Sequence, residues 1–248
     1  MQPTDQQTWR AGRFWWDRPR PHGVTRHPLR AIVFDLDALA DIECEGHLPA
    51  FNAAFAAVGL KIRWTIARYR QLLVLRDERS RVAAELRKRG VNSECDVLTE
   101  LLADQVCAAK DAILDEAILD ADIAVRTGLL DLIADAFGAG IAIAVVSSGR
   151  HTWVEPLVRQ LVGEGIVSTI VTAPDVPASN LYQVALAELG VDPEDGIAFA
   201  GSAAGQRKAA AAGLATVLIG HDTAGAPLRV AECQRVHDKW QEASRPAA

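Results

Sequence analysis

Cysteines are few in this sequence and long apolar runs are absent, and each shortage excludes a class of protein. The four cysteines are widely scattered among 248 residues, and no two have the C-x-x-C spacing of metal ligands. Neither a zinc site nor a disulfide framework is therefore indicated. No apolar run reaches the roughly 18 residues that a membrane span needs, and no apolar segment of the secretory type stands near the first residue. We expect a cytoplasmic protein with reduced thiols and no membrane contact.

Positive charge falls short of negative charge over most of the chain, but not at its beginning. Residues 1–30 carry six arginines against two aspartates, while the net charge of the whole chain is −6. The remainder is therefore strongly acidic, and no nucleic-acid partner is expected.

Residues 1–28 form an Arg- and Trp-rich N-terminal extension that prolines interrupt. We expect a surface tail that lays its aromatic rings on the body of the protein. The alternative is a contact with a protein partner or a second copy through residues 9–20, because Trp and Arg are typical anchors of interfaces.

From residue 29 onward, short apolar runs alternate with helical patterns. The apolar runs are rich in β-branched residues and apolar on both faces, as buried parallel strands are. They cover residues 31–35, 141–147, 166–171, 196–200 and 215–219. The helical patterns cover residues 126–138, 152–162, 180–189 and 203–212. Such alternation predicts an α/β fold, a doubly wound parallel sheet with helices on both faces.

One long segment interrupts this alternation. Between residues 47 and 120 the apolar spacing is helical, and no convincing strand pattern occurs. The segment predicts a helical cap inserted after the first strand. We expect a core formed by residues 29–46 and 122–248, with the cap over residues 47–121.

Two aspartates follow the first predicted strand, at the edge where a doubly wound sheet binds its ligand. Asp35 can attack phosphorus as a nucleophile. Asp37, two residues further along extended backbone, can protonate a leaving oxygen and then activate water. The structural alternative is that Asp35 merely ends a strand and Asp37 caps a turn.

Hydroxyl and guanidinium groups follow the second predicted strand. Ser147 and Ser148, with the free N–H groups of the next helix, can hold phosphate oxygens, and Arg150 can add a bidentate contact. The plainer alternative is that Ser148 or Thr152 caps the helix. The two interpretations are compatible.

Three stretches in this order carry a family resemblance: FDLD, VVSS and GSAAGQRKAAAAGL, with the helical segment after the first. They resemble the haloacid dehalogenase superfamily. More narrowly, they resemble its beta-phosphoglucomutase-like branch, which includes the sugar-bisphosphate phosphatases of photosynthetic bacteria. HLPAFNAAFAAVGL resembles the first cap helix of that branch. The resemblance covers about residues 30–220 and implies a Rossmann-like core with a helical cap.

The resemblance implies a role for single residues. Asp35 matches the nucleophile and Asp37 the acid/base, and the two are the implied ligands of Mg²⁺. Ser147 matches the phosphate-binding hydroxyl. His47 matches a histidine at the entry of the cap that positions the acid/base, and Arg207 matches an arginine of the last motif. The implied ligand is a small phosphorylated metabolite.

The sequence departs from the family pattern at three places. Ala38 stands where the family has the glycine of a tight turn. Val176 takes the place of a lysine, and no lysine occurs from residue 111 to residue 207. Ala200-Gly201 replaces the acidic pair that holds Mg²⁺, and no acid occurs between residues 196 and 221.

These departures lead us to expect a degenerate site. The expected protein is weakly active or inactive, binds Mg²⁺ weakly, and acts as a phospho-ligand-binding or partner-binding protein. The alternative is an active Mg²⁺-dependent phosphatase or phosphomutase that works on a sugar phosphate through an aspartyl-phosphate. In that alternative Arg150, Arg207 or Lys208 supplies the substitute positive charge.

Overall fold

The computed structural model describes residues 28–91, 95–176, 180–220 and 225–244. The chain divides into two compact units. The core unit runs up to Ala40 and resumes at Val125, and the helical unit is Asp41–Ala124. The expected N-terminal extension, with its docking residues 9–20, lies outside the described residues apart from Pro28. Within the described ranges, no helix is long and apolar enough to cross a membrane.

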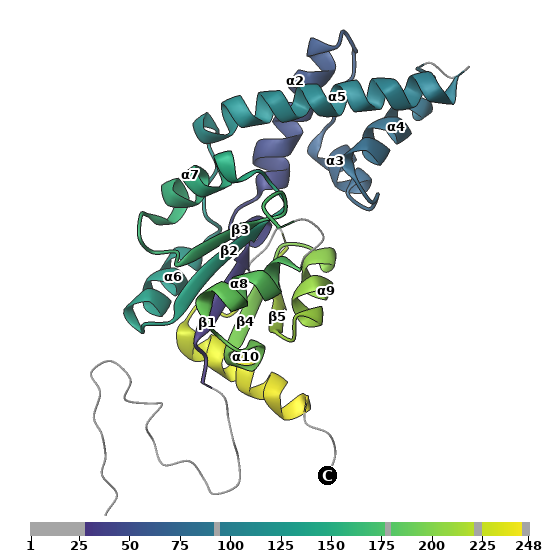
Figure 1. The fold of residues 1–248 in the computed structure, drawn as a ribbon. Coiled ribbons are helices and arrows are strands. Elements are labelled where there is room, and N and C mark those ends of the chain that lie inside the picture. The colour runs from purple at the N-terminus through teal and green to yellow at the C-terminus, as the bar shows by residue number, and fades with distance from the viewer. Residues whose placement is uncertain (1–27, 92–94, 177–179, 221–224, 245–248) are drawn as a thin grey trace, which may run out of the picture. The chain divides into compact units, whose positions relative to one another are not determined.

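A five-stranded parallel sheet forms the centre of the core unit (Figure 1). Its strands are β1 (Ala31–Asp35), β2 (Ala142–Ser147), β3 (Thr169–Thr172), β4 (Gly196–Ala200) and β5 (Ala215–Leu218). They lie in the order β3-β2-β1-β4-β5, so β1 is the central strand. Each strand overlaps a predicted apolar run, because a strand buried on both faces needs apolar side chains on both. The predicted doubly wound α/β fold is confirmed.

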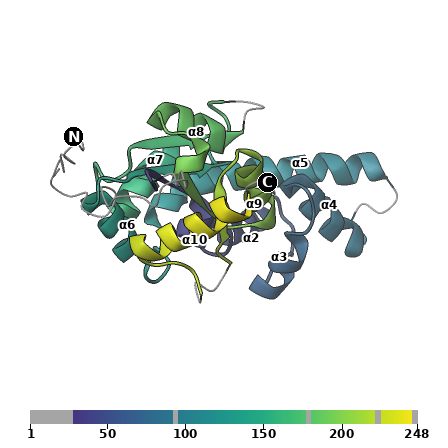
Figure 2. The ribbon, with the colours of Figure 1, turned by 90° about the horizontal axis from the view of Figure 1, so that it is seen from below.

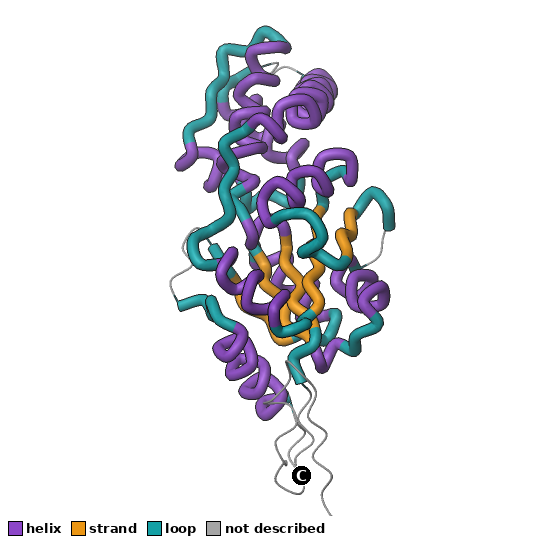
Figure 3. Tube along the Cα trace, turned by 90° about the vertical axis from the view of Figure 1, so that its left-hand side faces the viewer, coloured by secondary structure: helices purple, strands orange, loops and turns teal. Residues whose placement is uncertain are grey.

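Helices cover both faces of the sheet. They are α6 (Leu129–Gly138), α7 (His151–Val162), α8 (Leu181–Leu189), α9 (Ala203–Ala211) and α10 (Val230–Ala243). α8 packs on β1, β2 and β3, and α9 packs on β4 and β5. Figure 2 shows α8 and α10 on opposite sides of the sheet, and Figure 3 shows the strands between two helical layers.

Each face of the sheet contributes to a separate apolar layer. Val33 packs with Tyr182 and Leu186 of α8 in one layer. The next residue along β1 points to the opposite face, where the rings of Phe34 and Phe199 stack with centroids 5.0 Å apart. Full burial of one such large apolar side chain stabilises the fold by about 1.5–3 kcal/mol.

The helical unit contains no strand in its described residues. Its elements are η1 (Glu43–His47), α2 (Leu48–Ala57), α3 (Ile66–Leu72), α4 (Glu78–Lys88), α5 (Asp96–Ala117) and η2 (Ile118–Asp120). An aromatic cluster fills its interior, in which the Trp64 ring lies 4.9 Å from Phe51 and 4.8 Å from Phe55. The unit therefore has an apolar core of its own.

Backbone pairing closes the core unit where the helical unit begins and ends. Ala40 forms an antiparallel bridge with Val125, and Arg126 N–H donates to the Leu39 carbonyl at 2.9 Å. These bonds hold the residues on both sides of the junction in the core unit. The helical unit is consequently wider than the expected span of 47–121 at both ends.

Candidate active site

The register of the sheet brings two of the predicted site residues to one edge of the core unit. Asp35, the last residue of β1, pairs with Val146 of β2, so Ser147 follows immediately on the neighbouring strand. On the other side of β1, Phe34 pairs with Phe199, which places Ala200 next to Asp35. The carboxyl ends of the three central strands thus meet at Asp35.

The chain turns into a short helix directly after Asp35. Asp35 is the N-cap of α1 (Leu36–Leu39), and its Oδ1 accepts from Asp37 N–H at 3.4 Å. The expectation that Asp37 continues along extended backbone is therefore wrong, because the cap starts a helical turn at the next residue. Asp35 itself, rather than Asp37, has the capping role.

Ala38 does not carry the strain that its departure from the family pattern suggests. It lies in the α1 turn, fully buried, and helical backbone is open to any L-residue. The glycine that lets two backbone segments approach closely is instead Gly201, which lies against the α1 turn. A Cβ atom at Gly201 would lie 2.5 Å from the Asp37 carbonyl carbon and 2.7 Å from Ala38 N. This backbone leaves no room at residue 201 for the acid of the family pattern.

An arginine that the sequence analysis missed lies at the aspartate turn. Arg126 Nη2 donates to the Asp37 carbonyl at 3.1 Å and to the Ala40 carbonyl at 3.5 Å. Its position at the start of the helical pattern of residues 126–138, just after the inserted segment, was the available signal. Arg126 brings positive charge to α1 in a region without lysine.

The arginines and the lysine predicted as substitute cations have exposed side chains. Arg207 is exposed on α9, where its Nε donates to the Ala203 carbonyl one turn earlier at 3.2 Å. Arg150 and Lys208 are exposed as well.

Ser147 lies buried at the end of β2, and its hydroxyl accepts from Gly149 N–H at 3.0 Å. Ser148 is exposed. The helix α7 begins only at His151, with Arg150 as an N-cap that makes no side-chain hydrogen bond. The alternative in which Ser148 or Thr152 caps this helix is therefore wrong.

The N-terminus of α9 packs directly on the Asp35 carboxylate. Ser202 caps the helix, and its Oγ accepts from Gly205 N–H at 3.1 Å. A methyl group on Gly205 would lie 2.6 Å from Asp35 Oδ2, and 3.4 Å from both Ser202 Oγ and the Tyr182 hydroxyl. The three oxygens therefore surround one small space beside Gly205. Tyr182 was not among the predicted site residues.

The predicted histidine belongs to the helical unit. His47 Nδ1 lies 3.5 Å from Glu78 Oε1. Burial, followed by the positive charges of Lys110 and Arg81, lowers the pKa of His47 from 6.5 to about 3. The imidazole is therefore neutral near pH 7.

The side chains around Asp35 offer oxygen donors to a magnesium ion. Among the described residues, no three His, Cys, Asp or Glu side chains gather to hold a metal. The groups present are nevertheless hard oxygen donors, from Asp35, Asp37 and Ser202, which Mg²⁺ prefers. Mg²⁺ is commonly held by one or two carboxylates together with substrate phosphate and water. The donor set fits that sparse arrangement.

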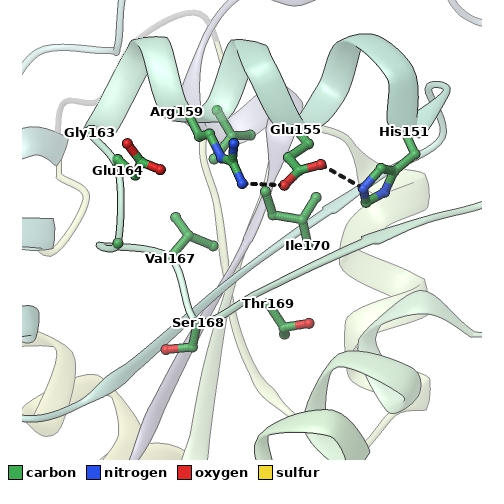
Figure 4. A pocket seen from close by; sticks show the side chains of 11 residues that line it. His151, Glu155, Arg159, Gly163, Glu164, Val167, Ser168, Thr169 and Ile170 are labelled. Carbon is green, nitrogen blue, oxygen red and sulfur yellow. Dashed lines mark hydrogen bonds and ion pairs between the residues drawn. The ribbon is translucent and has the colours of Figure 1, made fainter.

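A separate cleft of about 380 Å³ lies between α7 and β3 (Figure 4). Three of its lining residues pair with one another: Glu155 contacts His151 Nε2 at 3.0 Å and Arg159 Nη2 at 2.6 Å. It shares no lining residue with the Asp35 site. Asp35 and Ser147 lie at the ends of β1 and β2, outside this cleft.

Comparison with known proteins gives consistent results. A family model described as haloacid dehalogenase-like hydrolase matches residues 29–213. Protein CbbY of Cereibacter sphaeroides is 35% identical over 198 residues, which cover 77% of this chain and 84% of that protein.

Two solved structures of CbbY from Rhodobacter sphaeroides are similar to this chain. The complex with phosphate has a TM-score of 0.60 at 32% identity, covering 77% of this chain and 85% of that one. An Asp-to-Asn mutant in complex with xylulose-(1,5)bisphosphate has a TM-score of 0.59 at 31% identity, with the same coverage.

Proposed function

Because the chain belongs to the haloacid dehalogenase-like hydrolase family, we propose that it is an active Mg²⁺-dependent phosphatase that hydrolyses a small sugar phosphate through an aspartyl-phosphate on Asp35. Family membership and the identity to CbbY support this alternative better than the expected weakly active or inactive binding protein. The observation that carries the proposal is the convergence of Asp35, Ser147 and the α9 N-terminus at one end of the sheet.

The reaction divides between the two aspartates. An oxygen of Asp35 attacks phosphorus, the bond to the sugar oxygen breaks, and Asp37 gives that oxygen its proton. Asp37 then takes a proton from water as the water attacks the phosphorus of the aspartyl-phosphate, which releases phosphate and restores Asp35. Asp35 and Asp37 would hold Mg²⁺, which when bound would neutralise the charge of the phosphoryl group.

The Ser147 hydroxyl and the Ser148 N–H hold the phosphoryl oxygens in this scheme, while Gly149 N–H orients the Ser147 hydroxyl. Arg126 holds the α1 turn through its hydrogen bond to the Asp37 carbonyl. Its positive charge offsets part of the negative charge of the two aspartates. It thereby replaces part of the electrostatic effect of the missing lysine. A bound phosphoryl group needs such compensation, since phosphoryl transfer depends mainly on positioning and charge.

The magnitude of the missing interactions also favours surviving catalysis. Loss of one preorganised electrostatic group costs about 10²–10³ in rate, so two losses cost on the order of 10⁴–10⁶. Enzymes accelerate phosphate-monoester hydrolysis by up to about 10²¹. A combined loss of this size is therefore small beside the acceleration that such enzymes reach.

The substrate class follows from the relatives. A CbbY mutant is known in complex with xylulose-(1,5)bisphosphate, and this chain covers 85% of that structure. We expect a phosphorylated sugar of similar size as the substrate, with the helical unit as the cap that selects it.

The proposal is tested by measuring phosphate release from xylulose-1,5-bisphosphate, other pentose and hexose phosphates and an aryl phosphate, with and without Mg²⁺. We expect Mg²⁺-dependent turnover that Asp35→Asn lowers at least about 10³-fold, because the nucleophile is lost. Asp192→Asn is the matched control, since Asp192 is exposed before β4, at the opposite end of the sheet. Turnover that survives in Asp35→Asn, or no turnover in the wild-type protein, contradicts the proposal.

A further inference from the structure

Tyr182 has a buried hydroxyl without a hydrogen-bond partner. The residue is only 2% exposed, at the start of α8, where its N–H donates to Asn180 Oδ1 at 3.1 Å. In the described part of the chain its hydroxyl has no partner. Buried tyrosine hydroxyls are usually hydrogen-bonded, so this donor calls for an explanation.

The hydroxyl faces the reacting carboxylate. A Cβ atom on Gly205 would lie 3.4 Å from this hydroxyl and 2.6 Å from Asp35 Oδ2, so both oxygens lie against the same residue of α9. Burial, followed by the charges of Asp35 and Asp37, raises the pKa of Tyr182. The group is therefore a protonated donor, and both carboxylates lie within its electrostatic reach.

Tyr69, the other tyrosine of the chain, has a hydroxyl with a structural role. Tyr69 is also fully buried, in the helical unit, but its hydroxyl donates to Glu43 at 2.5 Å. The donor of Tyr69 is thus used within the fold, whereas that of Tyr182 is directed to a site where the family lysine is absent.

We infer that Tyr182 is a catalytic residue whose hydroxyl donates a hydrogen bond to an oxygen of the phosphoryl group bound at Asp35. This inference rests on the proposed function for turnover, but it also applies to the binding of phosphate alone. In the absence of a lysine, a neutral O–H donor stabilises the phosphoryl oxygen without adding charge.

The test compares Tyr182→Phe with Tyr69→Phe in three measurements: kcat and KM for phosphate release, the dissociation constant of inorganic phosphate, and the thermal midpoint. We expect Tyr182→Phe to lower kcat by about 10²-fold, with a smaller change in KM, and to weaken phosphate binding. Its thermal midpoint should not fall, because the removed hydroxyl has no partner in the fold. Tyr69→Phe should lower the midpoint, since Glu43 loses its donor, but should keep kcat and phosphate affinity.

The outcomes separate this inference from the proposed function. If the wild-type protein hydrolyses a sugar phosphate and Tyr182→Phe matches it in kcat and phosphate affinity, the role of Tyr182 is refuted and the proposed function stands. If no substrate is hydrolysed but Tyr182→Phe weakens the binding of inorganic phosphate, the function fails and the hydrogen bond stands. A wild-type protein that neither turns over nor binds phosphate overturns both.

Discussion

Gly205 determines how closely α9 approaches the nucleophile. Its missing side chain lets the helix begin against Asp35, since any Cβ there would lie 2.6 Å from Oδ2. The backbone of α9 and the hydroxyl of its cap, Ser202, therefore define one wall of the site. A carboxylate held in this way has little freedom to rotate, and fixed geometry is a large part of catalysis.

Gly205→Ala is expected to displace Asp35 and to lower turnover by about 10²-fold, because small misplacements of reacting groups are costly. Overpacking should also lower the free energy of unfolding by about 1–3 kcal/mol. Steady-state phosphate release and denaturant unfolding measure the two effects. Gly138→Ala is the control, since a Cβ there meets nothing within 4 Å at the end of α6. Equal turnover in the two variants would show that α9 does not fix Asp35.

Some site residues could be located from the sequence and others could not. Asp35 and Ser147 directly end apolar runs, and parallel strands bring their carboxyl ends together. Arg126 and Tyr182 stand outside strand ends, so only folding shows which atoms they face. The predicted extended backbone at Asp37 was wrong, because the Asp35 side chain caps a helical turn that begins at the next residue.

At the scale of elements, the apolar patterns predict most strand and helix starts to within one residue, and the exceptions are β3, which starts at Thr169 rather than 166, and α6. β1 and β4 have the predicted bounds, whereas α6 starts at Leu129 rather than 126, because Gly128 has a left-handed φ of 84° and cannot extend the helix.

The helix α10 was not predicted. Its buried positions are Cys233, His237 and Gln241, and the last two are polar side chains that contact the Glu194 carbonyl. A helix held by hydrogen bonds shows little apolar periodicity.

Asn52 of α2 holds the segment before α3 in place through hydrogen bonds to the backbone N–H and carbonyl of Trp64. Its Oδ1 accepts from Trp64 N–H at 2.7 Å, and its Nδ2 donates to the Trp64 carbonyl at 3.1 Å. Asn52→Ala should lower the stability of the helical unit by about 1–3 kcal/mol, because two groups of a buried residue lose their partners. Denaturant unfolding followed by tryptophan fluorescence measures this loss. Gln71→Ala removes an exposed amide and should stay within about 0.5 kcal/mol of wild type. Similar losses in both variants would contradict the role of Asn52.

At the scale of the whole molecule, the doubly wound sheet and the family resemblance are confirmed. Both could be predicted because they depend on the order of motifs along the chain, and that order can be read directly from the sequence. The two units have separate apolar cores, so the stability of each can depend differently on pH.

His47 should make the stability of the helical unit depend on pH. Its pKa is about 3 in the folded unit and near 6.5 when unfolded, so the unfolded chain binds the proton more tightly. Its contribution to stability is complete above pH 6.5 and is lost as the pH falls toward 3. The slope is at most about 1.4 kcal/mol per pH unit.

Denaturant unfolding between pH 4 and pH 7.5 tests this dependence, with His47→Gln expected to flatten the profile over about that range. His151→Gln, in the core unit, is the control. An unchanged slope in His47→Gln would show that the ring is not neutral in the folded protein.

The bridge between Ala40 and Val125 has a consequence for the architecture. Any segment inserted there must begin and end at neighbouring backbone positions, because Ala40 and Val125 are paired with each other. A protein engineer could therefore replace residues 41–124 with a different module or a short linker and keep the core unit unchanged.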